Sequence, residues 1–430
     1  MTLDRTRPGT DRSGTDRTAR RAWAVFLAGI AALSVLLAGC GLDSLLATPT
    51  PAGPTATPTP FSLSEDALSA ALAAGLEAGE TKIDLSSLAI PGTYQEQVYA
   101  VFAQVLATHP AAYRCRGTLE YDLTSIDDGK TWTIRDVKPG YQPQSVLDAA
   151  DRWIAETGAA SASPRERVRL LHDKVVLSTS YDTAAAEAGD AALPAFSAAG
   201  VFEKGKAVCQ GYAEALNVLL NRAGVPTVYA SGSAKGIAHA WVLVQLDGKW
   251  YHVDATFDDP VPDTPGQTNY LYFLMDDAAI GKDHIRDLAV PACTDATHAW
   301  MWAMQDAVRL PDGRFAYSDA TADGTVSTIG ADGGGRERIP FQRYGKTYKT
   351  TRGYFLCVAK DGAIYLSNYS DGATIYRRKA GETVLTVFAP AGYPDGISSA
   401  KDLRIVGTNL TFDLMDDKGN VTGSGSVPLG

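Results

Sequence analysis

The sequence predicts a multidomain α+β protein, and three features of the 430-residue chain support that prediction. An apolar leader is followed by a Thr/Pro-rich stretch, so the folded part begins well inside the chain. Between Gly205 and Pro260 a helical pattern precedes two strand-like runs. After His298, short alternating runs recur between turns that contain glycine. We therefore expect a leader at 1–39, a tether at 40–60, a small α+β domain at 61–142, a larger α+β domain at 143–298 and a β-repeat domain at 299–430.

The first 39 residues are typical of a secretory signal. Six arginines lie between residues 5 and 21, and an unbroken run of apolar and small residues extends from Ala22 to Ala38. The end of this run, Leu37-Ala-Gly-Cys40, resembles a bacterial lipobox, in which the cysteine is lipidated and becomes the mature N-terminus. The alternative is an uncleaved signal anchor, because about 17 such residues almost span a bilayer. Both alternatives place the rest of the chain outside the cytoplasm, anchored to the bacterial cell membrane.

The next segment separates the anchor from the folded part. Residues 40–60 are rich in alternating threonine and proline, which cannot form a core and favour an extended conformation. At about 3 Å per residue, the Thr/Pro-rich part of this tether, residues 47–60, would span roughly 40 Å. Loss of residues 1–39 removes six Arg and three Asp, so the formal charge falls from −10 to −13. Because an acidic chain binds nucleic acid and anionic membranes poorly, we expect no nucleic-acid partner and attachment through the lipid on Cys40.

The domain expected at 61–142 carries no recognisable chemistry. Ser64 is a suitable N-cap for an Ala- and Leu-rich helix, and a second helical pattern covers residues 93–107. Strand-like runs are expected at 82–85, 117–123 and 130–137.

Two helices, at 146–158 and 164–180, are expected to open the larger domain. Ser163 and Pro164 suit the start of the second helix. His172 lies on that helix and is expected to cap or pack. Tyr181 follows it and is a candidate for the wall of a cleft, although a packed aromatic is its more ordinary role.

Cys209 lies at the start of the next predicted helix. The segment that leads to it, Glu203-Lys-Gly-Lys206, is polar, which argues against a position in a core. Apolar residues then recur at helical spacing from 212 to 223, until Gly224 ends the pattern. Unpaired N–H groups and the dipole at a helix N-terminus favour a thiolate over a thiol. Cys209 is therefore the candidate nucleophile, with its backbone N–H as an oxyanion donor, and the alternative is an ordinary buried cysteine.

A predicted hairpin supplies a base and its partner. Residues 239–246 and 249–254 form strand-like runs, and Asp247-Gly248 between them is a strong two-residue turn signal. This turn pairs Leu246 with Lys249 and makes His239 and Asp254 diagonal neighbours on one face, about 7–8 Å apart by position and within reach of a side-chain hydrogen bond. His252 shares the face, but it stands beside the carboxylate rather than over it.

Three segments together resemble the transglutaminase-like superfamily: Gly-Lys-Ala-Val-Cys209-Gln-Gly-Tyr-Ala, His239-Ala-Trp-Val and Trp-Tyr-His-Val-Asp254-Ala-Thr-Phe-Asp-Asp-Pro. The resemblance covers about residues 151–298. It implies a papain-like core with Cys209 as nucleophile, His239 as base and Asp254 as the group that orients the base. Gln210 and Trp241 lie within these motifs and become candidate cleft residues.

The resemblance leaves the reaction open, because this core serves both acyl transfer to amines and peptide hydrolysis. We expect the Cys209 thiolate to attack an amide carbonyl and form a thioester. Asp182, Asp258 and Asp259 suggest an acidic neighbourhood that would attract a lysine-like amine, whereas a protein outside the cell meets abundant water and few amines. We therefore favour hydrolysis of a peptide or isopeptide bond in protein or cell-wall material. The alternatives are a protein cross-linking transglutaminase and a non-catalytic surface or cell-wall binding module.

The last domain contains three similar segments at 311–317, 360–365 and 407–412, about 47–49 residues apart. Such spacing indicates blade-like β units. Because three units are too few for an ordinary closed propeller, we expect a partial propeller, an open β stack or a sheet packed on the preceding domain.

The remaining cysteines and carboxylates suggest neither a fixed disulfide nor a metal. Cys115, Cys293 and Cys357 permit one disulfide in an oxidising compartment, without indicating which pair. No Cys/His cluster has the spacing of zinc ligands, and Asp258-Asp259 lack the loop of a calcium site. We expect no metal and no other cofactor.

Overall fold

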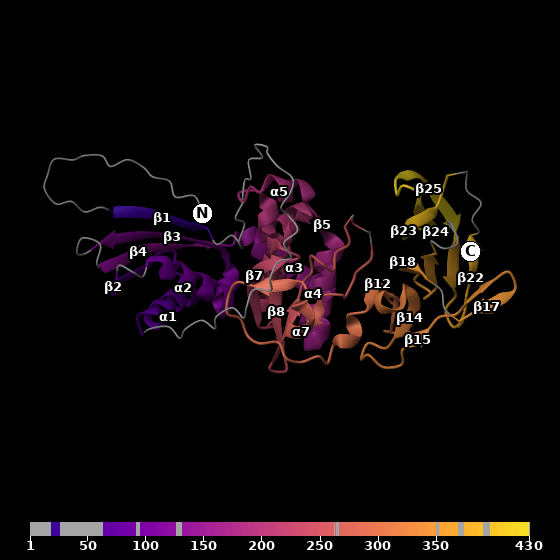
Figure 1. Cartoon of the computed structure of the whole chain (residues 1–430), viewed down its shortest axis with the longest axis horizontal. Coiled ribbons are helices and arrows are strands. Elements are labelled where there is room, and N and C mark those ends of the chain that lie inside the picture. The colour runs from indigo at the N-terminus through magenta and orange to yellow at the C-terminus, as the bar shows by residue number, and fades with distance from the viewer. Residues whose placement is uncertain are drawn as a thin grey trace, which may run out of the picture.

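The computed structural model describes residues 19–25, 63–91, 95–125, 131–261, 263, 266–349, 352–368, 374–389 and 396–429. The predicted lipidation site Cys40 and the tether at 40–60 lie outside the described residues. The elements follow one another along the long axis of the molecule, with the N-terminal strands at one end and the C-terminal sheets at the other (Figure 1). Within the described part of the chain, no helix is both long and apolar enough to cross a bilayer.

The N-terminal unit is a four-stranded antiparallel sheet with two helices. The sheet order is β1-β3-β4-β2. Leu72, Leu76 and Phe102 of the helices pack with Ile134 and Val137 of the sheet in one hydrophobic core. This arrangement agrees with the expected α+β domain. The bounds are β1 (Ala19–Val25), α1 (Leu63–Ala78), β2 (Ile83–Pro91), α2 (Gln95–Thr108), β3 (Cys115–Ser125) and β4 (Thr131–Tyr141).

Strand β1 departs from the prediction, because it belongs to the leader that was expected to take no part in the fold. It pairs antiparallel with β3, from Ala19 opposite Thr124 to Val25 opposite Thr118. The backbone groups at the outer edge of β3 need partners, and the Ala-Trp-Ala-Val run of the leader is suited to pairing there. Removal of residues 1–39 would make β3 an edge strand of a three-stranded sheet.

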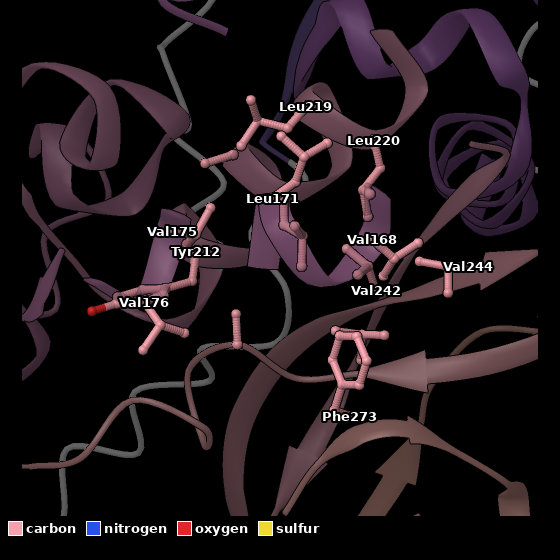
Figure 2. Packing of buried hydrophobic residues seen from close by; sticks show 14 of the residues in the cluster. Val168, Leu171, Val175, Val176, Tyr212, Leu219, Leu220, Val242, Val244 and Phe273 are labelled. Atoms are coloured by element: carbon pink, nitrogen blue, oxygen red, sulfur yellow. The ribbon is translucent and has the colours of Figure 1, made fainter. Parts of the chain in front are cut away.

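The central unit places helices against a five-stranded sheet of order β10-β9-β8-β7-β11. Figure 2 shows Val168 and Leu171 of α4, Leu220 of α6, and Val242 of β8 with Phe273 of β10 gathered in its core. The helices are α3 (Gln144–Thr157), α4 (Pro164–Ser178), α5 (Thr183–Ala188), α6 (Cys209–Arg222) and α7 (Asp277–Ile280). The strands are β5 (Ser180–Tyr181), β6 (Lys206–Ala207), β7 (Thr227–Ala234), β8 (Ile237–Leu246), β9 (Lys249–Val253), β10 (Phe273–Met275) and β11 (His284–Arg286).

Helix α6 is the centre of this unit and is buried from Gly211 to Leu220. It packs on β7 and β8 on one side and on α3 and α4 on another. A Cβ at Gly211 would come within 2.5 Å of the Ala195 carbonyl oxygen, so only glycine allows the neighbouring segment to approach this closely. The close packing fixes the first turn of α6, which carries Cys209.

The described residues after 298 form three further sheets, each containing one of the predicted repeats. The segments at 311–317, 360–365 and 407–412 lie in the hairpins β12–β13, β18–β19 and β23–β24, each of which links the first two strands of an antiparallel meander. The propeller-like arrangement of these sheets stays a prediction. The bounds are β12 (Met304–Arg309), β13 (Phe315–Asp319), β14 (Thr325–Ile329), β15 (Glu337–Arg338), β16 (Phe341–Arg343), β17 (Lys346–Tyr348), β18 (Tyr354–Val358), β19 (Ile364–Ser367), β21 (Ile375–Arg378), β22 (Leu385–Ala389), β23 (Ser399–Val406), β24 (Asn409–Met415) and β25 (Val421–Pro428).

The sheet that begins with β12 shares its core with the central helices. Met304, Phe315, Tyr317 and Ile329 belong to the same buried cluster as the residues of α4 and α6. The position proposed from sequence as a domain boundary, after His298, therefore falls beside a continuous core.

Candidate active site

Cys209 is the first residue of α6 and is half-buried. Val208, in an extended conformation, precedes it, and the Tyr212 N–H makes the first backbone bond of the helix, to the Val208 carbonyl. The N–H groups of residues 209–211 have no partner within the helix because they belong to its first turn. The predicted setting, a thiol at a helix N-terminus, is present.

The β8–β9 hairpin has the predicted register. Leu246 pairs with Lys249, and the ladder continues to Val242 opposite Val253. Asp247 and Gly248 both have positive φ, 50° and 78°, which suits a turn of type I′. Asp254 follows β9 directly, and its Oδ2 lies 2.7 Å from Nε2 of His239. The structure thus brings the predicted base and its partner into a hydrogen bond.

The His239 ring links the carboxylate to the thiol. Burial by itself lowers the pKa of His239, but the charge of Asp254 and hydrogen bonds with Asp254 and Cys209 outweigh burial and raise this pKa to about 10. Burial raises the pKa of Asp254, and its two histidine neighbours reverse that effect and lower it. Because Nε2 of His239 is bonded to Asp254, its Nδ1 is the nitrogen left for the Cys209 thiol. The ring is therefore placed to exchange a proton with the thiol.

The sequence of this region matches the family model of the transglutaminase-like superfamily over residues 151–255. Residues 151–255 are a transglutaminase-like domain. The chain is also 31% identical to mouse (Mus musculus) kyphoscoliosis peptidase over 160 residues, which is 33% of this chain and 24% of the relative. The human (Homo sapiens) protein of that name is 31% identical over 154 residues, 32% of this chain and 23% of the relative. The chain therefore spans about a quarter of the length of these curated relatives. Among solved structures, that of a TGase aligns at 21% identity over 32% of this chain and 43% of the other, with a TM-score of 0.25.

The three candidate cleft residues of the transglutaminase-like domain have different surroundings. Burial, followed by the charges of Cys209 and Asp254, raises the pKa of Tyr181 to about 12. Gln210 is half-buried in the first turn of α6. Trp241 is 1% exposed, so the prediction that it lines a cleft is wrong. Its ring stacks on His239 at 6.0 Å between centroids.

Two histidines of the domain have structural surroundings. The Trp241 Nε1–H donates to Nδ1 of His252 at 2.9 Å, and Nε2 of His252 lies 2.9 Å from Asp277. His172 is fully buried on α4, with its ring nitrogens 3.2 Å from Asp173 and 3.2 Å from Asp258. Burial lowers the pKa of His172, but the two carboxylates outweigh burial and raise it to about 9. His172 packs in the core, as the sequence predicts.

The acidic neighbourhood expected from Asp182, Asp258 and Asp259 is not formed. Asp258 and Asp259 are 0% and 4% exposed, and burial raises their pKa values to about 6 and about 7. Asp259 accepts a hydrogen bond from the Tyr212 hydroxyl, so both carboxyls belong to the interior. Asp182 caps α5 by accepting a 3.0 Å bond from the Ala185 N–H. The expectation is wrong because two of these side chains are buried and the third caps a helix.

Sequence reasoning missed His284. Its Nε2 lies 3.1 Å from the same Asp254 oxygen that bonds to His239, and its Nδ1 lies 2.6 Å from Asp283. The side chain is 0% exposed. The only signal in the sequence is the Asp283-His284 pair in a short strand-like run, without an apolar pattern or glycine motif to single it out.

Two groups of side chains in the described residues have donor atoms within 4.8 Å of one another, the spacing that a metal ion needs. In the group of His239, Asp254 and His284, the 2.7 Å nitrogen–oxygen distance is that of a hydrogen bond. In the group of His252, Asp277 and Cys293, Nδ1 of His252 accepts from Trp241, so Nε2 carries the proton and has no lone pair for a metal. The donor sets fit hydrogen bonding better than metal binding, and the expectation of no metal stays a prediction.

The disulfide that the sequence permits is not formed. Cys115, Cys209, Cys293 and Cys357 are all free. Cys115 belongs to the core of the N-terminal unit, Cys293 to a cluster beside β8, and Cys357 packs against the core of the last sheets. Burial raises the pKa of each of these three thiols to about 12. Their positions in separate cores explain why no pair bonds.

Proposed function

We propose that the protein is a cysteine-dependent enzyme that cleaves amide bonds through a thioester intermediate. The observation that carries the proposal is the continuous contact from Cys209 through His239 to Asp254, with the sulfur at a helix N-terminus. A nucleophile, a base and a group that orients the base are what covalent catalysis of acyl transfer requires.

The residues act in two half-reactions. In the first, the Cys209 thiolate attacks the amide carbonyl carbon, and N–H groups of the first turn of α6 stabilise the oxyanion. The His239 imidazolium gives its Nδ1 proton to the leaving amine as the carbon–nitrogen bond breaks and the thioester forms. In the second, His239 takes a proton from water, whose oxygen attacks the thioester and releases a carboxylic acid and the thiolate. Asp254 holds the ring with Nε2 protonated throughout.

Hydrolysis is favoured over amine transfer because the feature that would attract a lysine-like amine is missing. Asp258 and Asp259 face the interior, and Asp182 caps a helix. The curated relatives carry the name peptidase, which supports the same choice. We propose a peptide or isopeptide bond in protein or cell-wall material as the substrate.

The deciding experiment supplies both acceptors. The full chain, Cys209→Ala and the control Cys357→Ala are incubated with a glutamine-bearing protein and a fluorescent primary amine. New peptide termini that depend on Cys209, without fluorescence in the protein, support hydrolysis. Cysteine-dependent incorporation of the amine would instead assign protein cross-linking. No turnover, together with binding to cell-wall material that Cys209→Ala leaves unchanged, would assign a non-catalytic binding module.

We further propose that the protein acts outside the cytoplasm, anchored to the bacterial membrane by a lipid on Cys40. The leader, the Leu-Ala-Gly-Cys40 segment and the Thr/Pro tether support this location. Labelling with a fatty acid should be lost in Cys40→Ala. Retention of the label, or a cytoplasmic protein in fractionated cells, would contradict the proposal.

A further inference from the structure

His284 joins the site from a strand that lies beyond the matched family segment. It is the first residue of β11, and its ring contacts Asp254. The Oδ2 atom of Asp254 accepts from Nε2 of both His239 and His284. The other oxygen, Oδ1, accepts from the N–H groups of Thr256 and Phe257 at 3.0 and 3.2 Å. Both oxygens of the buried carboxylate are therefore held by two donors each.

The sheet delivers His284 to this position. β11 pairs with the edge of β7, where His284 lies opposite Ala234. A Cβ at Gly232 would overlap the Ile285 carbonyl oxygen, so glycine is required for β11 to lie this close to β7. The His284 ring packs edge-to-face on Trp241, with centroids 5.1 Å apart. The ring is fixed by the fold before any substrate arrives.

The hydrogen-bond count defines what His284 does. Its Nδ1 faces the Asp283 carboxylate at 2.6 Å, and its Nε2 faces Asp254 at 3.1 Å. An ionised carboxylate only accepts hydrogen bonds, and a neutral imidazole has a single N–H to donate. Both contacts are satisfied together only when both ring nitrogens carry a proton. A charged ring between two carboxylates offsets their charge in the interior.

We propose that His284 is a positioning residue, whose imidazolium holds the Asp254 carboxylate on His239 and balances its charge. This inference rests on the proposed roles of Cys209, His239 and Asp254. His284 acts on His239 through Asp254. Loss of its positive charge leaves a more negative site, in which the Cys209 thiolate is harder to form. Several other titratable or charged groups face this ring or its two carboxylates and contribute to the pH response: His239, His252, Tyr272 and Lys235.

The test measures how fast iodoacetamide alkylates Cys209 as a function of pH, which needs no substrate. His284→Gln keeps an N–H donor toward Asp254 but removes the charge, and His284→Leu removes both. His298→Gln, which changes a histidine packed on Tyr251 instead, is the control. Melting curves identify any variant that fails to fold. If His284→Leu fails to fold, the test depends on His284→Gln.

We expect the pH midpoint of alkylation to rise by about 0.5–1 unit in His284→Gln, because a nearby charge is lost. In His284→Leu the rate at pH 7 should fall by about tenfold or more. His298→Gln should match the wild type. In nitrogen-15 histidine spectra, the signals that disappear in His284→Gln should show both ring nitrogens protonated at pH 7.

An unchanged midpoint in His284→Gln, or a neutral His284 in the spectra, would overturn the proposal. The proposal would also be overturned if a chelator abolished the reactivity of Cys209 and added zinc restored it, because His239, Asp254 and His284 would then hold a metal. A different result would count against the catalytic roles themselves: wild-type Cys209 that reacts no faster than a free thiol at neutral pH. The two failures are therefore distinguishable.

Discussion

Glu214 on α6 should make the protein less stable at neutral pH than at mildly acidic pH. It is 7% exposed, and burial raises the pKa of its carboxyl from 4.5 to about 7, although bonds from the Ala198 N–H and from Gln142 oppose the effect. Between pH 4.5 and about 7, the Glu214 carboxyl keeps its proton in the folded state and has released it in the unfolded state. The unfolding free energy therefore falls as the pH rises from 4.5 to 7, and the loss amounts to about 3 kcal/mol at 1.36 kcal/mol per unit.

Glu214→Gln should remove this loss. A glutamine amide resembles the protonated acid: its oxygen accepts from the Ala198 N–H, and, once the Gln142 amide turns over, its NH₂ donates to the Gln142 oxygen, which is buried without a partner among the described residues. We expect the variant and wild type to have similar stability at pH 4.5, and the variant to be more stable by about 3 kcal/mol at pH 8.

Denaturant unfolding at pH 4.5 and at pH 8 measures the unfolding free energy of the wild type and of the variant. Glu203→Gln, a change at an exposed glutamate that accepts a bond from Ser145, is the matched control and should leave the difference between the two pH values unchanged. A Glu214→Gln protein that is less stable than wild type at pH 8 would refute the reasoning. Such a result would mean that the two hydrogen bonds stabilise the charged carboxylate by more than its burial costs.

Three other experiments probe the site. Asp254→Asn should lower kcat by about 10⁴-fold, because the NH₂ of the amide would face donors in either orientation, the two histidines or the N–H groups of Thr256 and Phe257, and a peptide-cleavage assay with near-normal kcat would contradict this. Iodoacetamide at pH 7 should label Cys209 before the three thiols whose pKa burial raises to about 12, and mass spectrometry that finds equal labelling would count against an activated cysteine. Gly232→Ala should reduce the unfolding free energy by about 1–3 kcal/mol and slow the alkylation of Cys209, because its Cβ overlaps the Ile285 carbonyl, whereas Ser233→Ala should do neither. Equal melting curves for these last two variants would mean that β11 adjusts without cost.

The site could be predicted from sequence where local rules determine it. Asp247-Gly248 fixes the turn, the turn fixes the register, and the register brings His239 and Asp254 together. The position of Cys209 follows in the same way from the helical pattern after it. Each of these steps depends on neighbours close in the chain.

The rest depends on contacts that no local pattern records. His284 reaches Asp254 because β11 returns to the edge of β7 after β10 and α7. Asp258 and Asp259 looked like solvent-facing acids, but their partners His172 and Tyr212 come from α4 and α6. The alternation of side chains along β8 places Trp241 on the same face as His239, but His252 and His284 contact its ring there. The repeats after residue 298 were visible as a period, but the period did not distinguish a sheet packed on the preceding domain, as the first C-terminal sheet is, from a partial propeller or an open stack.

That packing has a consequence for how the chain unfolds. Phe315 of β13 lies under the guanidinium of Arg169 on α4, and Thr268 bridges to Ala307 of β12. A fragment limited to residues 151–255 would expose the apolar residues of α4 that Met304 and Phe315 cover, and it would lack His284. The helices and the first C-terminal sheet should therefore lose their amide-exchange protection together, as one cooperative unit. A transglutaminase-like domain separated from the sheet that follows it should then be less stable and easier to inactivate.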